Sequence, residues 1–115
     1  MADAVSVANA EHYGWGEGCD GWRLLEDAGL SVIRERVPAG KGEVAHRHAR
    51  AQQSFYVLSG RARIELEGGA VELAPGEGLH VPAGARHCFR NAGEGAVEFL
   101  VISSPTTRGD RENLA

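Results

Sequence analysis

The sequence has only two cysteines in 115 residues, no cluster of lysines and arginines, and no run of eighteen apolar residues. Cys19 and Cys88 are too few for a disulfide framework, and their spacing fits no zinc ribbon, so we expect two reduced thiols. Because the net charge is −4 and no basic cluster is present, we expect no nucleic-acid partner. With no long apolar run and no basic start, the sequence predicts no membrane partner and a cytoplasmic location.

Glycine, by contrast, is abundant, with sixteen residues alongside four prolines. Such frequent turn residues favour an all-β protein over a helical one. A length of 115 residues suits one domain, and a hydrophobic fraction of 43% is enough for one packed core. Short alternating segments between these turns, such as the one from Arg61 to Glu67, predict at least eight strands.

The stretch from Gly40 to Gly60 carries the strongest chemical signal. His46 and His48 are two residues apart in a segment that reads as a strand, so their side chains leave the same face about 7 Å apart. Two imidazoles on one face can chelate Fe, Mn, Ni, Zn or Cu. A single HxH pattern is weak evidence, and its surroundings decide what it means.

Two glycine-bounded segments surround this pair. The first has this spacing: Gly40, five residues, His46, Arg47, His48, four residues, Gln53, six residues, Gly60. The second has this spacing: Gly76, five residues, Pro82, Ala83, Gly84, two residues, His87, three residues, Asn91. Together they resemble the two motifs of the cupin family and cover nearly half of the chain.

This resemblance implies a single-domain antiparallel β-barrel of the jelly-roll, or double-stranded β-helix, type. It also implies one divalent metal ion inside the barrel, identity undetermined, held by His46, His48, Gln53 and His87. The family usually has Glu where this chain has Gln53, and the neighbouring Gln52 fits a looser spacing after HxH. An amide oxygen can bind a metal but brings no negative charge, so the alternative is that Gln53 is a polar wall residue of a barrel without metal.

We expect three regions along the chain. Residues 1–21 form an N-terminal arm and a glycine-rich, aromatic loop laid over an apolar surface, residues 22–104 form the barrel, and residues 105–115 form an irregular tail that could fold back over a sheet edge. In an alternative interpretation, Tyr13, Trp15 or Trp22 lines the mouth of a pocket.

Several other side chains have two interpretations. Arg34 and Arg36 alternate with Ile33 and Glu35, which is typical of a solvated face, but they would bind anions if they faced inward. His80 reads as an outer-wall or supporting residue, with a direct catalytic role as the alternative. Cys88 is expected to point away from the metal held by His87.

The predicted function is that of a mononuclear metalloenzyme acting on a small organic substrate, by isomerase, lyase or dioxygenase chemistry. The alternative is a cupin that binds a small ligand without turnover. The chain also looks like small cupins that open the ring of unsaturated uronate sugars, some of which carry Gln at this ligand position. Those enzymes have an acidic residue in the last strand, where this chain offers only Glu98. Because a small jelly roll leaves edge strands uncovered, we predict a homodimer.

Overall fold

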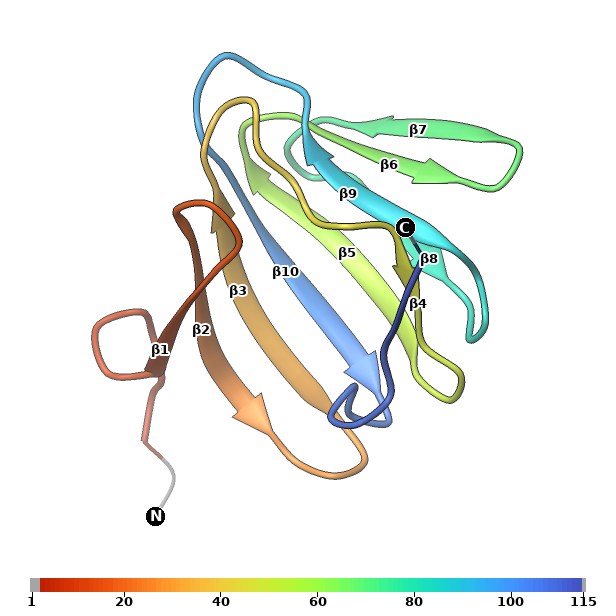
Figure 1. The fold of residues 1–115 in the computed structure, drawn as a ribbon. Helices are drawn as coiled ribbons and strands as arrows, with labels where there is room; N and C mark the ends of the chain where they lie inside the picture. The colour runs from red at the N-terminus through yellow and green to blue at the C-terminus, as the bar shows by residue number, and fades with distance from the viewer. Residues whose placement is uncertain (1–2, 115) are drawn as a thin grey trace.

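The computed structural model describes residues 3–114, and within them eleven strands form two antiparallel sheets that face each other (Figure 1). Sheet A has six strands in the order β1 (Glu11–Trp15), β2 (Cys19–Glu26), β3 (Ser31–Val37), β10 (Val97–Ser104), β5 (Gln52–Ser59) and β8 (Gly78–Val81). Sheet B has five strands in the order β11 (Glu112–Asn113), β4 (His46–Arg47), β9 (His87–Asn91), β6 (Ala62–Leu66) and β7 (Gly69–Leu73). The all-β architecture of two antiparallel sheets expected from the sequence is confirmed.

The strands follow the alternation of apolar and polar residues in the sequence. In β5, Gln53, Phe55 and Val57 are buried, while Ser54 and Tyr56 between them are exposed. Successive side chains of a strand point to opposite faces, so a one-residue slip would expose the whole apolar set. The buried residues of both sheets meet between them in one core, formed by Cys19, Val37, Phe55, Val57, Ala62, Ile64, Leu73, Val81, Phe89, Val97, Phe99 and Val101.

Two motif residues serve the fold itself. Gly60 directly follows β5 and has a positive φ of 82°, and a Cβ at this position would lie against the backbone of Ala96. A residue other than glycine would therefore be strained and would also clash. Asn91 ends β9, and its side-chain amide donates hydrogen bonds to the carbonyls of Val37 and Gly95. Both residues fix turns at the same end of the barrel.

The N-terminal region differs from the expectation. The segment predicted to be a loop up to residue 21 forms β1 and the start of β2, which pair as an antiparallel hairpin with Trp15 opposite Cys19. Its glycines did not prevent pairing, because Gly16 and Gly18 lie in the turn between the strands. At Gly21 within β2, the missing side chain leaves room for the ring of Tyr13.

The tail after β10 also contains a strand that the sequence did not predict. It crosses from the end of β10 to the edge of sheet B, where β11 pairs with β4 (Figure 1). The expectation of an irregular tail is therefore wrong at Glu112–Asn113, whereas its return to a sheet edge is confirmed. This crossing brings residues of the tail next to the HxH pair.

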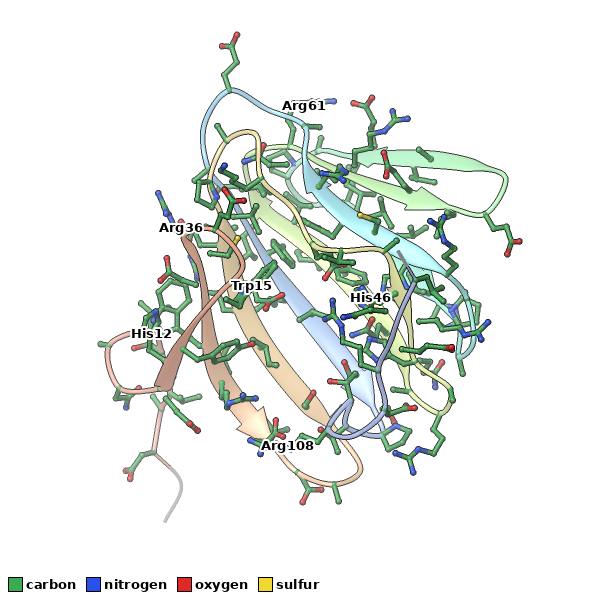
Figure 2. All side chains as sticks on the ribbon, in the orientation of Figure 1. His12, Trp15, Arg36, His46, Arg61 and Arg108 are labelled. Atoms are coloured by element: carbon green, nitrogen blue, oxygen red, sulfur yellow. The ribbon has the colours of Figure 1, made fainter. Side chains whose placement is uncertain are left out.

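The outer surface carries the side chains that were expected to be solvated. Arg34 pairs with Glu98 at 2.9 Å, and Arg36 lies on the same outer face of sheet A. Figure 2 shows Arg36 and His12 on the outside of this sheet, in contrast to His46, which lies between the sheets. The anion-binding interpretation of Arg34 and Arg36 inside the barrel is therefore wrong, because the register of β3 turns both residues outward.

None of residues 3–114 forms a helix long and apolar enough to cross a lipid bilayer. The homodimer and the cytoplasmic location stay predictions. Light scattering over a dilution series tests the dimer, since a mass near 12.2 kDa at every concentration would contradict it.

Candidate metal centre

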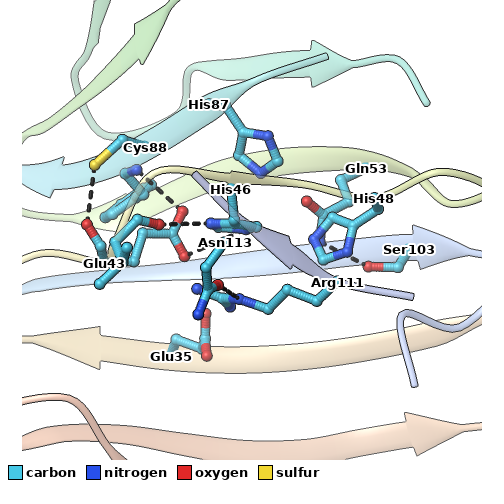
Figure 3. Close-up of polar contacts among 12 residues, drawn as sticks. Glu35, Glu43, His46, His48, Gln53, His87, Cys88, Ser103, Arg111 and Asn113 are labelled. Atoms are coloured by element: carbon cyan, nitrogen blue, oxygen red, sulfur yellow. Dashed lines mark hydrogen bonds and ion pairs between the residues drawn. The ribbon is translucent and has the colours of Figure 1, made fainter. Parts of the chain in front are cut away.

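Three histidines meet inside the barrel from two strands of sheet B and the loop that follows one of them. His46 in β4 lies directly opposite His87 in β9, and His48 follows two residues after His46 on the same face. All three are buried, and their candidate ligand nitrogens lie within 4.8 Å of one another (Figure 3). Pairing of β4 with β9 thus brings together residues that are 39 and 41 positions apart in the sequence.

The tautomer of each imidazole is set by a hydrogen bond on its far side. Nδ1 of every histidine lies at hydrogen-bond distance from a backbone carbonyl oxygen: 2.7 Å for His46 to Val44, 2.6 Å for His48 to Asp110, and 3.0 Å for His87 to Ala85. A carbonyl can only accept, so Nδ1 carries the proton and Nε2 keeps its lone pair. Such bonds are the usual way in which proteins orient histidine ligands for a metal.

The charge state of the histidines agrees with this role. Burial lowers the pKa of His46 to about 3 and also lowers the pKa values of His48 and His87. The imidazoles are therefore neutral at physiological pH, which is the form that binds a metal.

Within the described part of the chain, Nε2 of His87 is buried and has no hydrogen-bond partner.

Gln53 enters the same space from sheet A. Its side-chain Nε2 donates a hydrogen bond to Ser103 Oγ at 3.1 Å, which turns Oε1 toward the histidines (Figure 3). Among residues 3–114, this buried Oε1 has no hydrogen-bond donor. Gln52 instead is exposed on the other face, where its Oε1 lies 2.9 Å from Nε2 of the exposed His80. The alternation of β5 therefore excludes Gln52 and leaves Gln53 facing the centre.

The centre opens into a cavity of about 180 Å³ between the two sheets, and two carboxylic acids line it. Glu43 precedes β4 and places Oε2 at 3.9 Å from Nε2 of His46, while its Oε1 accepts the backbone N–H of Phe89. Glu35 projects inward from β3. Burial raises the pKa of Glu43 to about 8, with a further contribution from Glu35, and burial raises the pKa of Glu35 to about 7.

Two aromatic residues of the N-terminal hairpin complete one wall. Tyr13 and Trp15 both line the cavity, and the Tyr13 hydroxyl donates to Glu35 Oε2 at 3.3 Å. The guanidinium of Arg23 lies 4.4 Å from the centre of the Tyr13 ring, a cation–π contact that holds the ring in place. Trp22 points to the outer face, where its ring lies 5.3 Å from that of His12. Of the three aromatics proposed for a pocket mouth, Tyr13 and Trp15 thus line the cavity.

One positive charge reaches the cavity from the tail. Arg111 lines it just before β11, and its Nε donates to Asn113 Oδ1 at 2.8 Å. None of the ion pairs among the described residues includes Arg111, although Glu35 and Glu43 are near enough for Arg111 to lower their pKa values. The terminal nitrogens of Arg111 are thus available to an anionic group of a ligand.

Sequence reasoning missed Glu35, Glu43 and Arg111: Glu35 and Arg111 lie outside both motifs, and Glu43 occupies one of the unspecified positions between Gly40 and His46. Alternation in β3 was the one available signal, since it places Glu35 on the same face as Ile33 and Val37. Glu98, the nearest acid in the last strand, faces outward and bonds to Arg34. Cys88 also points away from the centre, as expected, and its Sγ donates to the Glu43 carbonyl.

The donor atoms fit a metal ion. Three imidazole groups and one amide oxygen face one buried space, and among residues 3–114 two of the donor atoms, His87 Nε2 and Gln53 Oε1, are buried without a hydrogen-bond partner, which is rare in folded proteins. Imidazole is a ligand for Zn, Cu, Fe and Ni alike, and an amide oxygen also suits Mn, so the donors do not identify the metal.

Comparison with known proteins identifies the family. The cupin domain profile matches residues 33–103, which include the three histidines and Gln53. The chain belongs to the cupin family. A curated relative of this cupin, quercetin 2,3-dioxygenase of Bacillus subtilis, is 34% identical over 64 residues, which are 56% of this chain and 19% of the relative. The chain spans between 17% and 60% of the length of eight curated relatives.

Solved structures show the same fold at low sequence identity. KdgF from a Halomonas species superposes with a TM-score of 0.82 at 22% identity, covering 92% of this cupin and 96% of KdgF. Pac13 of Streptomyces, a nucleoside dehydratase determined with uridine, gives a TM-score of 0.81 at 21% identity, covering 99% and 91% of the two chains. At this level of identity, the similarities show the fold alone.

Proposed function

We propose that this cupin is a mononuclear metalloenzyme that acts on a small organic acid. The observation that carries the proposal is the convergence of three Nε2 atoms and the Gln53 amide oxygen on one side of a cavity that also contains Glu35 and Arg111. A pure binding site needs no proton-transfer group, whereas this cavity contains two carboxyl groups whose pKa values lie near neutrality.

The ligands proposed for the metal are His46, His48, Gln53 and His87. All four are neutral donors, so a bound divalent ion would keep its full charge of +2 instead of the +1 left by one carboxylate ligand. Together with Arg111, this charge favours an anionic substrate. A cavity of about 180 Å³ is smaller than the roughly 300 to 1,000 Å³ typical of sites for drug-sized ligands, which indicates a small molecule.

When bound, the metal would supply a Lewis acid that polarises an oxygen of the substrate. The protein's own groups then have separate tasks. Arg111 at the mouth orients the anionic group of the substrate, and the Tyr13 and Trp15 rings cover its apolar side. Glu35, whose pKa is about 7, accepts or returns a proton, and the Tyr13 hydroxyl fixes its orientation by donating to Oε2. This division of tasks suits isomerisation or elimination.

Metal analysis followed by ligand binding tests the proposal. The purified protein should contain close to one transition-metal ion per chain. Isothermal titration with small carboxylates should show binding that Arg111→Ala weakens about tenfold or more, whereas Arg61→Ala, on the surface away from the cavity, should bind normally. Neutral amides of the same acids should bind weakly to every variant. A metal-free protein after reconstitution attempts, or equal binding of acids and amides, would contradict the proposal.

A further inference from the structure

The tail segment 105–114 covers the edge of sheet B and, in addition, contacts the residues of the metal centre. The Asp110 side chain is 4% exposed, and its carboxylate accepts hydrogen bonds from three consecutive backbone N–H groups, those of Ala49, Arg50 and Ala51. The three donor–acceptor distances are 2.9, 3.0 and 2.9 Å. These residues form the turn that directly follows His48.

The same residue also contacts His48 itself. The backbone carbonyl of Asp110 accepts the Nδ1–H of His48 at 2.6 Å, the shortest of the three histidine contacts. His46 and His87 bond to carbonyls only two residues before them, so their orientation is set locally. His48 alone depends on a residue 62 positions away.

The charge of Asp110 is what makes this arrangement stable. Three N–H donors aimed at one carboxylate form charge-assisted hydrogen bonds, which are about twice as strong as bonds between neutral groups. Without the carboxylate, three N–H groups beside the metal centre would lose their acceptor at once. After Asp110 in the chain, Asn113 pairs with His46 and the Leu114 N–H donates to the Ala45 carbonyl, so the tail runs alongside β4.

We infer that Asp110 is a positioning residue of the metal centre: it fixes the turn after His48 and holds the carbonyl that keeps His48 in the tautomer with a bare Nε2. The tail therefore helps to orient a proposed metal ligand, and it also places Arg111 in the wall of the cavity. This inference rests on the proposed metal function, because it assigns Asp110 a role toward one of the proposed ligands. Its test includes measurements on metal-free protein.

The experiment compares Asp110→Ala and Asp110→Asn with wild type and with Glu112→Ala. Glu112 is the matched control, since it lies on the same tail and bonds Arg47 at 2.6 Å on the exposed side. Chelator competition with Zn²⁺ should show a loss of affinity of about 10- to 100-fold for Asp110→Ala, a smaller loss for Asp110→Asn, and less than a twofold change for Glu112→Ala. Asparagine retains one acceptor oxygen, so this variant gives the answer if the alanine variant fails to fold.

Two readouts on the metal-free protein separate the inference from the proposed function. Imidazole ¹⁵N shifts should show His48 as the Nδ1–H tautomer in wild type and as a mixture of tautomers in the Asp110 variants, with His46 and His87 unchanged. Hydrogen exchange at the amides of residues 49–51 should accelerate in the same variants. If wild type bound no metal, the proposed function would fail while these readouts still decided the role of Asp110. Unchanged His48 shifts and unchanged zinc affinity, even with a lowered melting temperature, would overturn the inference.

Discussion

The interior of the barrel has an apolar half, in which aromatic rings pack against one another, and a polar half, in which two buried polar atoms have no hydrogen-bond partner among residues 3–114. In the apolar half, the rings of Phe89 and Phe99 stack with centroids 3.9 Å apart, and Phe55 packs on Phe89 at 5.6 Å. In the polar half, His87 Nε2 and Gln53 Oε1 are buried without partners among the described residues. The Phe55 ring lies at the boundary, 5.9 Å from the His87 ring.

This difference separates the source of stability from the source of function. Apolar packing gains free energy in proportion to the surface removed from water, and it needs no ligand to do so. Buried polar atoms without partners cost free energy unless something else satisfies them. The polar half is therefore the part of the barrel that gains most from a bound metal and substrate, at the expense of the stability of the empty protein.

The largest expected effect is on the apolar half. Phe89→Ala should lower the free energy of unfolding by about 3 to 5 kcal/mol, because it removes a fully buried ring and leaves a cavity between Phe55 and Phe99. Urea denaturation measures this loss. Tyr56→Ala on the exposed face of β5 serves as the control and should cost far less. Equal losses for the two variants would mean that the apolar half does not dominate stability.

Replacing a proposed metal ligand should change metal binding much more than it changes folding. His87→Ala should reduce metal affinity by more than about 100-fold while the barrel stays folded, because it removes a donor and no apolar packing of comparable size. Metal content after dialysis and circular dichroism measure the two effects. His80→Ala is the matched control, since this histidine is exposed and bonds to Gln52. Full metal occupancy in His87→Ala would refute the site.

Glu35 connects the polar half to the pH dependence of stability. Its pKa is about 7 in the folded chain against an ordinary value of 4.5, so the folded state holds this proton more tightly than the unfolded state. The contribution to stability is therefore complete below pH 4.5 and is lost as the pH rises through 7. Glu35→Gln removes this loss, and the metal-free variant should therefore gain about 3 kcal/mol relative to wild type between pH 4.5 and pH 8.5.

Urea denaturation of both proteins in the presence of a chelator, at pH 4.5, 6.5 and 8.5, measures this gain. Glu67→Gln on the exposed surface is the control for the loss of one carboxylate. Tyr13, Arg23, Arg111 and Glu43 are the charged or titratable groups that act on Glu35, and they are unchanged in the variant. Parallel pH profiles for wild type and Glu35→Gln would show that Glu35 is not desolvated as the fold implies.

The smallest expected effect concerns Gln53. Gln53→Glu adds one negative charge to the proposed ligand set, which should raise the affinity for Zn²⁺ about tenfold and weaken the Lewis acidity of the bound ion. Ser103 can keep the contact by donating its hydroxyl to the new carboxylate. Chelator competition and a thermal melt of the metal-free variant measure both properties. Unchanged zinc affinity with a lowered melting temperature would show that Gln53 is a wall residue and not a ligand.

The barrel and its histidines follow from local sequence patterns. Alternation fixed the faces of β5 and β6 without tertiary information, because one face of each strand must be buried. The spacing of the two glycine-bounded motifs, through its resemblance to the cupin family, was enough to predict one site for His46, His48, Gln53 and His87. The hairpin of β1 and β2 escaped prediction, since its glycines and aromatic rings show no clear period.

The surroundings of these residues depend instead on how the sheets pair. Glu35 faces the cavity because β3 pairs with β10 in one register, and Arg111 and Asp110 reach the centre because the tail returns to β4. Such contacts join positions as far apart as His48 and Asp110, and local sequence preferences contain no information about them. Motif spacing is a property of one strand and its turns, whereas the acids, the arginine and the aspartate belong to the site through sheet pairing across the whole chain.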